Sequence, residues 1–141
     1  MGKLIIGGVL ITWALILAAR DFRTRTLPNI LTLPALLVAT VWAIASGNWW
    51  ALAGGLCWFL LYVLVGHVSA GIGGGDIKLA PTLGILIGTD GLVPVLIAIG
   101  LAQIFSIATG LLFKQKRIPH GPGMLLATAL VWLAVPAARL F

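Results

Sequence analysis

The chain has 141 residues, of which 61% are hydrophobic and only 9% are charged, and its mean hydropathy is +1.16. This composition excludes a soluble domain, because helices that face water carry polar stripes. It predicts an all-α, polytopic membrane protein, folded as a single membrane-embedded domain over residues 1–141. The net charge of +6 indicates cytoplasmic loops that face anionic membrane lipid, and no nucleic-acid partner is predicted.

Apolar runs separated by Gly, Pro and charged residues predict six transmembrane helices. The first run ends at Arg20 and is followed by further arginines, which is typical of a retained helix rather than of a cleaved signal peptide. Pro28 begins the second helix, since proline suits a first helical turn. Gly54 and Gly55 in the third allow close contact between helices. The predicted spans are 4–20, 29–46, 50–68, 77–89, 91–113 and 121–138.

The fourth predicted span is unusually short. Its 13 residues, 77–89, would cover about 20 Å as a helix, whereas the hydrocarbon core is about 30 Å thick. Such a helix fits only where neighbouring protein shields its ends or where water reaches it. It follows a glycine-rich loop, residues 71–75, so Asp76 is expected near a helix N-terminus, in a sheltered notch below the membrane surface. A charge at such a place is by default a functional hypothesis.

The basic residues are unevenly distributed over the predicted loops. Seven of the nine Lys and Arg residues follow the first, third and fifth spans, whereas Lys3 and Arg139 fall on the other side. The positive-inside rule therefore predicts that both termini lie outside, N-out and C-out, in the cytoplasmic (inner) membrane. Asp21 and Asp76 then share the cytoplasmic side, and Asp90 lies opposite as an ordinary turn residue.

Two acids at the same membrane depth suggest an aspartyl pair, Asp21 and Asp76. Two close carboxylates cannot both ionise cheaply, so they share a proton. The charged one can take a proton from water, and the protonated one can polarise a peptide carbonyl and protonate the leaving amine. Such a pair hydrolyses a peptide without a metal or a cofactor. His67 and His120 stand at unrelated positions and do not indicate a metal site.

The residues around both acids resemble the motifs of one family. Residues 21–29 read DFRTRTLPN, and residues 73–79 read GGGDIKL. Together they closely resemble the type IV prepilin peptidase family, which has an Asp, five residues, Ile or Leu and Pro-Asn, and later Gly-x-Gly-Asp-x-Lys-Leu. Residues 118–122, IPHGP, are similar to a third family motif near the end of the chain. The supporting motif residues are Pro28, Gly73, Gly75 and Lys78.

The resemblance implies an aspartic endopeptidase of the GxGD type, with Asp21 and Asp76 as its catalytic pair. Such an enzyme cleaves the basic leader of a prepilin or pseudopilin, the substrates of type IV pilus systems, at the cytoplasmic membrane face. Larger members of the family carry an N-terminal cysteine-bearing segment and also N-methylate the mature pilin. Without that segment the chain is similar to the short branch, which includes the peptidases of tight-adherence (Flp-type) pili, and methylation is not implied.

Other interpretations of the same residues stay open. Asp21 could be a topological charge that pairs with Arg20 or Arg25, and Asp76 could be a helix N-cap. The acids could also be proton sites in a small transporter or assembly protein. A presenilin-like intramembrane protease fits the glycine loop, although the first Asp of that family lies deep inside a helix, after a Tyr. Lys78 is expected to be a lipid or helix-end anchor.

Overall fold

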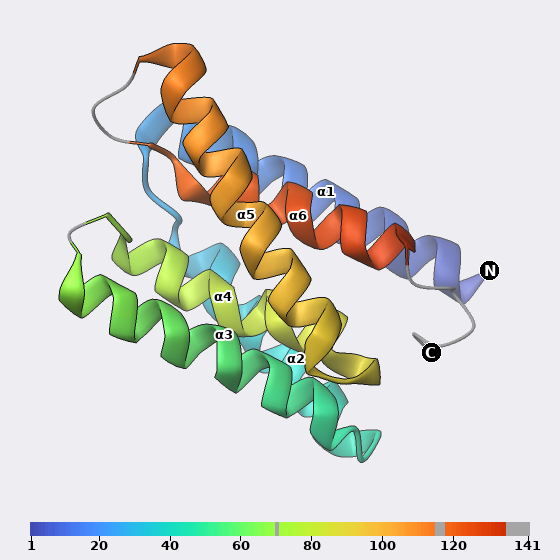
Figure 1. Cartoon of the computed structure of the whole chain (residues 1–141). Coiled ribbons are helices and arrows are strands. Elements are labelled where there is room, and N and C mark those ends of the chain that lie inside the picture. The colour runs from blue at the N-terminus through green and yellow to red at the C-terminus, as the bar shows by residue number, and fades with distance from the viewer. Residues whose placement is uncertain (70, 115–117, 135–141) are drawn as a thin grey trace.

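The computed structural model describes residues 1–69, 71–114 and 118–134, and these form an all-α bundle (Figure 1). Each of the six predicted spans corresponds to one α-helix within these ranges. The predicted end of the sixth span at 138, and Arg139, lie outside the described residues. The elements in chain order are α1 (Gly2–Thr24), α2 (Asn29–Ala45), α3 (Trp49–Val68), α4 (Gly74–Ile87), the short 3₁₀ helix η1 (Gly88–Asp90), α5 (Leu92–Phe113) and α6 (His120–Ala134).

Within the part of the chain that the structure describes, three helices are long and apolar enough to cross a membrane, namely Leu4–Thr24, Trp49–Val68 and Leu92–Phe113. Over the described residues, α2 and α6 are shorter apolar helices. The exposed surface of the bundle is rich in large apolar side chains along all of these helices, as expected where lipid is the solvent. Length and composition therefore support a membrane protein. Over the same described residues, α4 is the shortest of the α-helices.

The first helix ends later than predicted. α1 continues past Arg20 through Asp21 to Thr24, so Asp21 lies inside the last turn of a helix rather than after it. The Asp21 carbonyl accepts the Arg25 N–H at 2.8 Å, and Arg25 has a left-handed φ of 52°. This is a common way for a helix to end. The boundary was predicted too early because the arginines end the apolar run, whereas the backbone hydrogen bonds continue.

α4 lies at the centre of the bundle. It packs against α3, α2 and α6, and most of its residues are buried. In Figure 1, α2, α3 and α4 form one half of the molecule, and α1 and α6 run side by side in the other, with α5 across α6. Protein therefore surrounds the short helix, which satisfies the condition that its length imposes.

The contact between α3 and α4 brings two backbones together. A Cβ atom on Gly84 would lie 2.5 Å from the carbonyl oxygen of Gly54, and one on Gly55 would lie 2.8 Å from the carbonyl oxygen of Pro81. No side chain fits between helices at such a distance, so glycine is required. The prediction that Gly54 and Gly55 mediate a close helix contact is confirmed.

The C-terminal end of α4 is held in place by Asn48, a residue of the turn between α2 and α3. Asn48 caps α3, because its Oδ1 accepts the Ala51 N–H at 3.0 Å. Its side-chain amide also donates to the carbonyl oxygen of Thr89 at 3.3 Å, which joins the α2–α3 turn to η1. Asp90 follows there and is exposed. Asp90 is thus at the far end of α4 from Asp76.

Candidate active site

Asp76 lies in the first turn of α4, where the glycine-rich stretch becomes helical. Gly73 is the N-cap and Gly74 begins the helix, so the loop predicted over 71–75 is shorter than expected. Asp76 Oδ2 accepts the backbone N–H of Gly73 at 3.4 Å, which is one half of a capping box and allows the helix to start early. The side chain is 8% exposed. The predicted placement of Asp76 at a helix N-terminus is confirmed.

Asp21 meets a second helix N-terminus. Its Oδ2 accepts the backbone N–H of Gly121 at 3.0 Å, and the residue is 5% exposed. Gly121 lies in the first turn of α6, where backbone N–H groups have no partner within the helix and carry partial positive charge. A Cβ on Gly121 would lie 2.5 Å from Asp21 Oδ2. Glycine at this position therefore lets the helix end approach the carboxylate and stabilise its negative charge.

The two acids come from distant parts of the sequence and interact. Asp76 lies at the start of α4, just before the predicted span 77–89. It is outside the three long apolar helices of the described chain. Burial raises the pKa of Asp76, and the charge of Asp21 raises it further, to about 7, whereas the Gly73 N–H lowers it. A carboxyl group whose pKa lies near neutrality can exchange a proton with a second carboxyl group close to it, so one of the pair can serve as the acid and the other as the base.

His120 is a residue of the site to which sequence reasoning gave no role. It is the first residue of α6, and its Nδ1 lies 2.9 Å from the Oγ of Ser106, which is buried on α5. It also contacts the backbone of Gly71 and interacts electrostatically with Asp21. His120 thus joins α5, α6 and the glycine-rich stretch directly beside Gly121. The partners of His120 are far from it in the chain, so spacing gave no signal.

The described side chains do not offer an obvious metal site. In the ranges that the structure describes, no three His, Cys, Asp or Glu residues gather where they could hold a metal ion. His67 and His120, the two histidines of the chain, belong to different helix ends, and His120 makes the hydrogen bond to Ser106 given above.

A buried tyrosine of α3 lies within electrostatic range of Asp76. Tyr62 accepts a hydrogen bond from Gln103 Nε2 at 3.1 Å, and its ring meets Trp58 edge to face, with centroids 6.1 Å apart. Tyr62 and Trp58 are buried in the core. The charge of Asp76 acts on the Tyr62 hydroxyl, so this network lies near the acid. It ties α3 and α5 together next to the start of α4.

The supporting residues around the two acids connect the motifs to each other. Pro28 is the N-cap of α2 rather than part of its first turn. A Cβ on Gly75 would lie 3.0 Å from the Cβ of Leu27, so the start of α4 packs closely on the segment after α1. Lys78 is exposed and its Nζ donates to Asn29 Oδ1 at 2.8 Å. Lys78 therefore links α4 to α2, which agrees with a helix-end anchor.

Fold and site together define a helical membrane protein with two buried, interacting aspartates where the ends of three helices meet. A model of the type IV leader peptidase family matches residues 8–138. The chain belongs to this family, and the resemblance read from the two Asp motifs is confirmed. It is therefore a peptidase, a hydrolase that acts on a protein substrate. Comparisons with curated proteins and with solved structures give no match.

Proposed function

We propose that this chain is an aspartic endopeptidase of the cytoplasmic membrane that removes the basic leader of a prepilin or pseudopilin at the cytoplasmic face. The observation that carries the proposal is the pair of buried acids, Asp21 and Asp76, whose charges interact at one end of the bundle. Membership in a leader peptidase family supports the class of substrate. The contact between the two Asp motifs supports their acting as a unit.

The surroundings of the two acids favour different roles for them. We assign the role of base to Asp21, because the Gly121 N–H stabilises its charge, and the role of acid to Asp76, because burial and the charge of Asp21 raise its pKa. Asp21 takes a proton from water as the water oxygen bonds to the scissile carbonyl carbon, and Asp76 protonates the carbonyl oxygen. Asp21 then passes its proton to the leaving nitrogen as the C–N bond breaks. Asp76 recovers its proton as the carbonyl reforms, so one water is consumed and the pair is restored.

The distribution of charge supports a cytoplasmic position for the acids. Basic side chains surround this end of the bundle, at the C-terminal ends of α1 and α5 and at the start of α4. All of them are exposed and suited to contact lipid phosphates. The positive-inside rule assigns such an end to the cytoplasm. The described residues concerned are Arg20, Arg23, Arg25, Lys78 and Lys114.

Co-expression with a candidate prepilin tests the proposal. We expect the prepilin to lose its leader, with the new N-terminus just before its apolar helix, as read by mass spectrometry of the product. A cut within the apolar helix would instead support a presenilin-like intramembrane protease. Proton-coupled exchange in vesicles with no cleavage would support a transporter and refute the peptidase proposal.

A further inference from the structure

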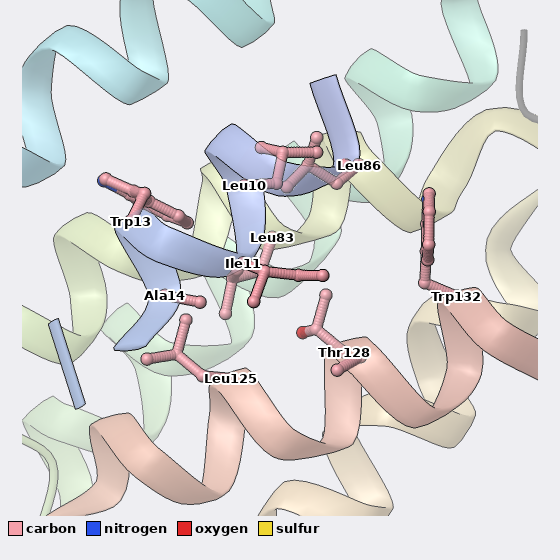
Figure 2. A pocket seen from close by; sticks show the side chains of 11 residues that line it. Leu10, Ile11, Trp13, Ala14, Leu83, Leu86, Leu125, Thr128 and Trp132 are labelled. Carbon is pink, nitrogen blue, oxygen red and sulfur yellow. The ribbon is translucent and has the colours of Figure 1, made fainter. Parts of the chain in front are cut away.

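An apolar cavity of about 90 Å³ lies between α1, α4 and α6. Figure 2 shows Trp13 of α1 and Trp132 of α6 on opposite sides of it, with Leu83 of α4 between them. Thr128 also lines the cavity, but its hydroxyl donates to the Met124 carbonyl at 2.8 Å. That hydroxyl is therefore satisfied within α6, and the cavity suits an apolar occupant.

The cavity lies deeper in the bundle than the two acids, and the distance can be counted along each of its three helices. Ala14 precedes Asp21 by seven residues on α1, and Leu83 follows Asp76 by seven on α4. Thr128 likewise follows Gly121 by seven on α6. Seven residues of helix correspond to about 10 Å. Because α1 ends where α4 and α6 begin, these three lining residues lie about two turns from the carboxylates, toward the interior of the membrane, and the cavity extends from there to Gly7.

The rim of the cavity is accessible from the lipid side. Ile11 is 60% exposed, Ala129 is exposed, and Gly7 is half-buried. A helix is about 10 Å wide or more, so the cavity is too small to hold one. It is large enough for an apolar side chain that projects from a helix lying against α1 and α6.

Resting on the proposed function, we propose that this cavity binds the substrate's apolar helix, by accepting a large apolar side chain about seven residues beyond the cleaved bond. The substrate chain leaves the acids toward the membrane interior, and its helix then runs along the same three elements. The cavity thereby selects substrates in which an apolar helix follows the leader directly, and it sets the distance between that helix and the cut.

Two adjacent glycines of α1 give a matched pair of variants. A Cβ atom added at Gly7 or at Gly8 would meet nothing within 4 Å, so a larger side chain fits at both positions. Gly7 lines the cavity, whereas Gly8 is exposed and is not part of its lining. Gly7→Leu should fill the cavity, and Gly8→Leu should change only the lipid-facing surface, with an equal gain in helix propensity.

The experiment measures cleavage of a full-length prepilin by the protein in vesicles. Gly7→Leu should raise KM about tenfold or more with kcat nearly unchanged, since the apolar side chain of the substrate loses its place in the cavity while the acids are untouched. Gly8→Leu should match the wild type. The difference should vanish with a peptide that carries the leader and the cut site but lacks the apolar helix. Equal KM values for both variants, or an equal loss on both substrates, would overturn the inference.

Photo-crosslinking separates this inference from the proposed function. A crosslinker placed about seven residues beyond the cut, in an inactive Asp76→Asn background, should attach to the cavity lining, and Gly7→Leu should abolish the adduct. Adducts only with lipid would overturn the inference and assign the cavity to an acyl chain. If the wild-type protein cleaves the prepilin, the proposed function stands whatever the crosslink shows, and if it does not, the proposed function itself fails.

Discussion

The backbone N–H of Gly121 donates a hydrogen bond to Oδ2 of Asp21 at 3.0 Å, across a separation of 100 positions in the sequence. This bond gives the third motif, residues 118–122, a physical role at the site. It brings the N-terminus of α6 onto the carboxylate that lies at the end of α1. The Asp21 carboxylate is thereby held in one orientation relative to Asp76.

The first prediction concerns Gly121. In Gly121→Ala the new Cβ would lie 2.5 Å from Asp21 Oδ2, so the carboxylate must move. We expect prepilin cleavage to fall on the order of 100-fold in kcat, since a displacement of about 1 Å has such an effect. Gly100→Ala on α5, where a Cβ meets nothing within 4 Å, is the control and should cleave normally. Near-normal cleavage by Gly121→Ala would contradict the role of this contact.

The second prediction concerns the acids themselves. Asp21→Asn and Asp76→Asn should each abolish cleavage at matched membrane expression, because Asn can neither activate water nor donate the acid proton. The double variant should be no worse than either single one, since the pair acts as a unit. Asp90→Asn, at the far end of α4, should be nearly silent. Substantial cleavage by either single variant would refute the proposed mechanism.

The third prediction separates positioning from simple packing at His120. His120→Leu should lower kcat about 10- to 100-fold with little change in KM, because α6 loses its hydrogen bond to Ser106 while no substrate contact is removed. His120→Asn should recover most of the activity, since its amide can occupy the place of Nδ1, and His120→Gln should recover less. Equal losses in all three variants would contradict a role through the hydrogen bond to Ser106.

The fourth prediction concerns the contact between α3 and α4. Gly84→Ala would push a methyl group into the backbone of Gly54, so the two helices must separate. We expect a loss of about 1–3 kcal/mol in the free energy of unfolding, the usual cost of overpacking, measured by reversible unfolding in mixed micelles. Gly8→Ala, with open space around it, should be neutral or slightly stabilising. If the two variants were equally stable, the close contact would not hold the bundle together.

The fifth prediction concerns orientation. A reporter fused after Gly47 should face the outer side, and one fused after Lys114 should face the cytoplasm, because the basic residues gather at the end that carries both acids. Alkaline phosphatase and fluorescent-protein fusions read the two sides with opposite signals. If both fusions reported a cytoplasmic position, the six-span topology and the placement of the acids would both be contradicted.

Much of the fold could be predicted from local patterns. Apolar runs broken by Gly and Pro located all six helices, and the position of Asp76 followed from the glycines before it and the apolar run after it. The shortness of α4 also appeared in the sequence, because both of its limits are local features. Gly54 and Gly55 were recognised as a contact surface, since small residues in a membrane helix have few other uses.

The missed features depend on tertiary structure. The end of α1 was placed too early, because charge marks where the apolar run stops and not where helical hydrogen bonds stop. The bond from Gly121 to Asp21 and the bond from His120 to Ser106 join residues whose neighbourhood exists only after folding. Chain spacing contains no signal for such pairs. For this reason the third motif marked a segment near the end of the chain, residues 118–122, but did not show what its residues contact.

The shortness of α4 has a consequence for biosynthesis. A helix of 14 residues with an acid in its first turn would not insert stably into a bilayer alone. Its glycine contact with α3 provides a partner that leaves the ribosome just before it, so the two would enter the membrane as a hairpin. At that stage the nascent chain already carries Asp21 and Asp76 but lacks α6. The newly made protein would therefore not cleave other membrane proteins until α6 is inserted and Gly121 reaches Asp21.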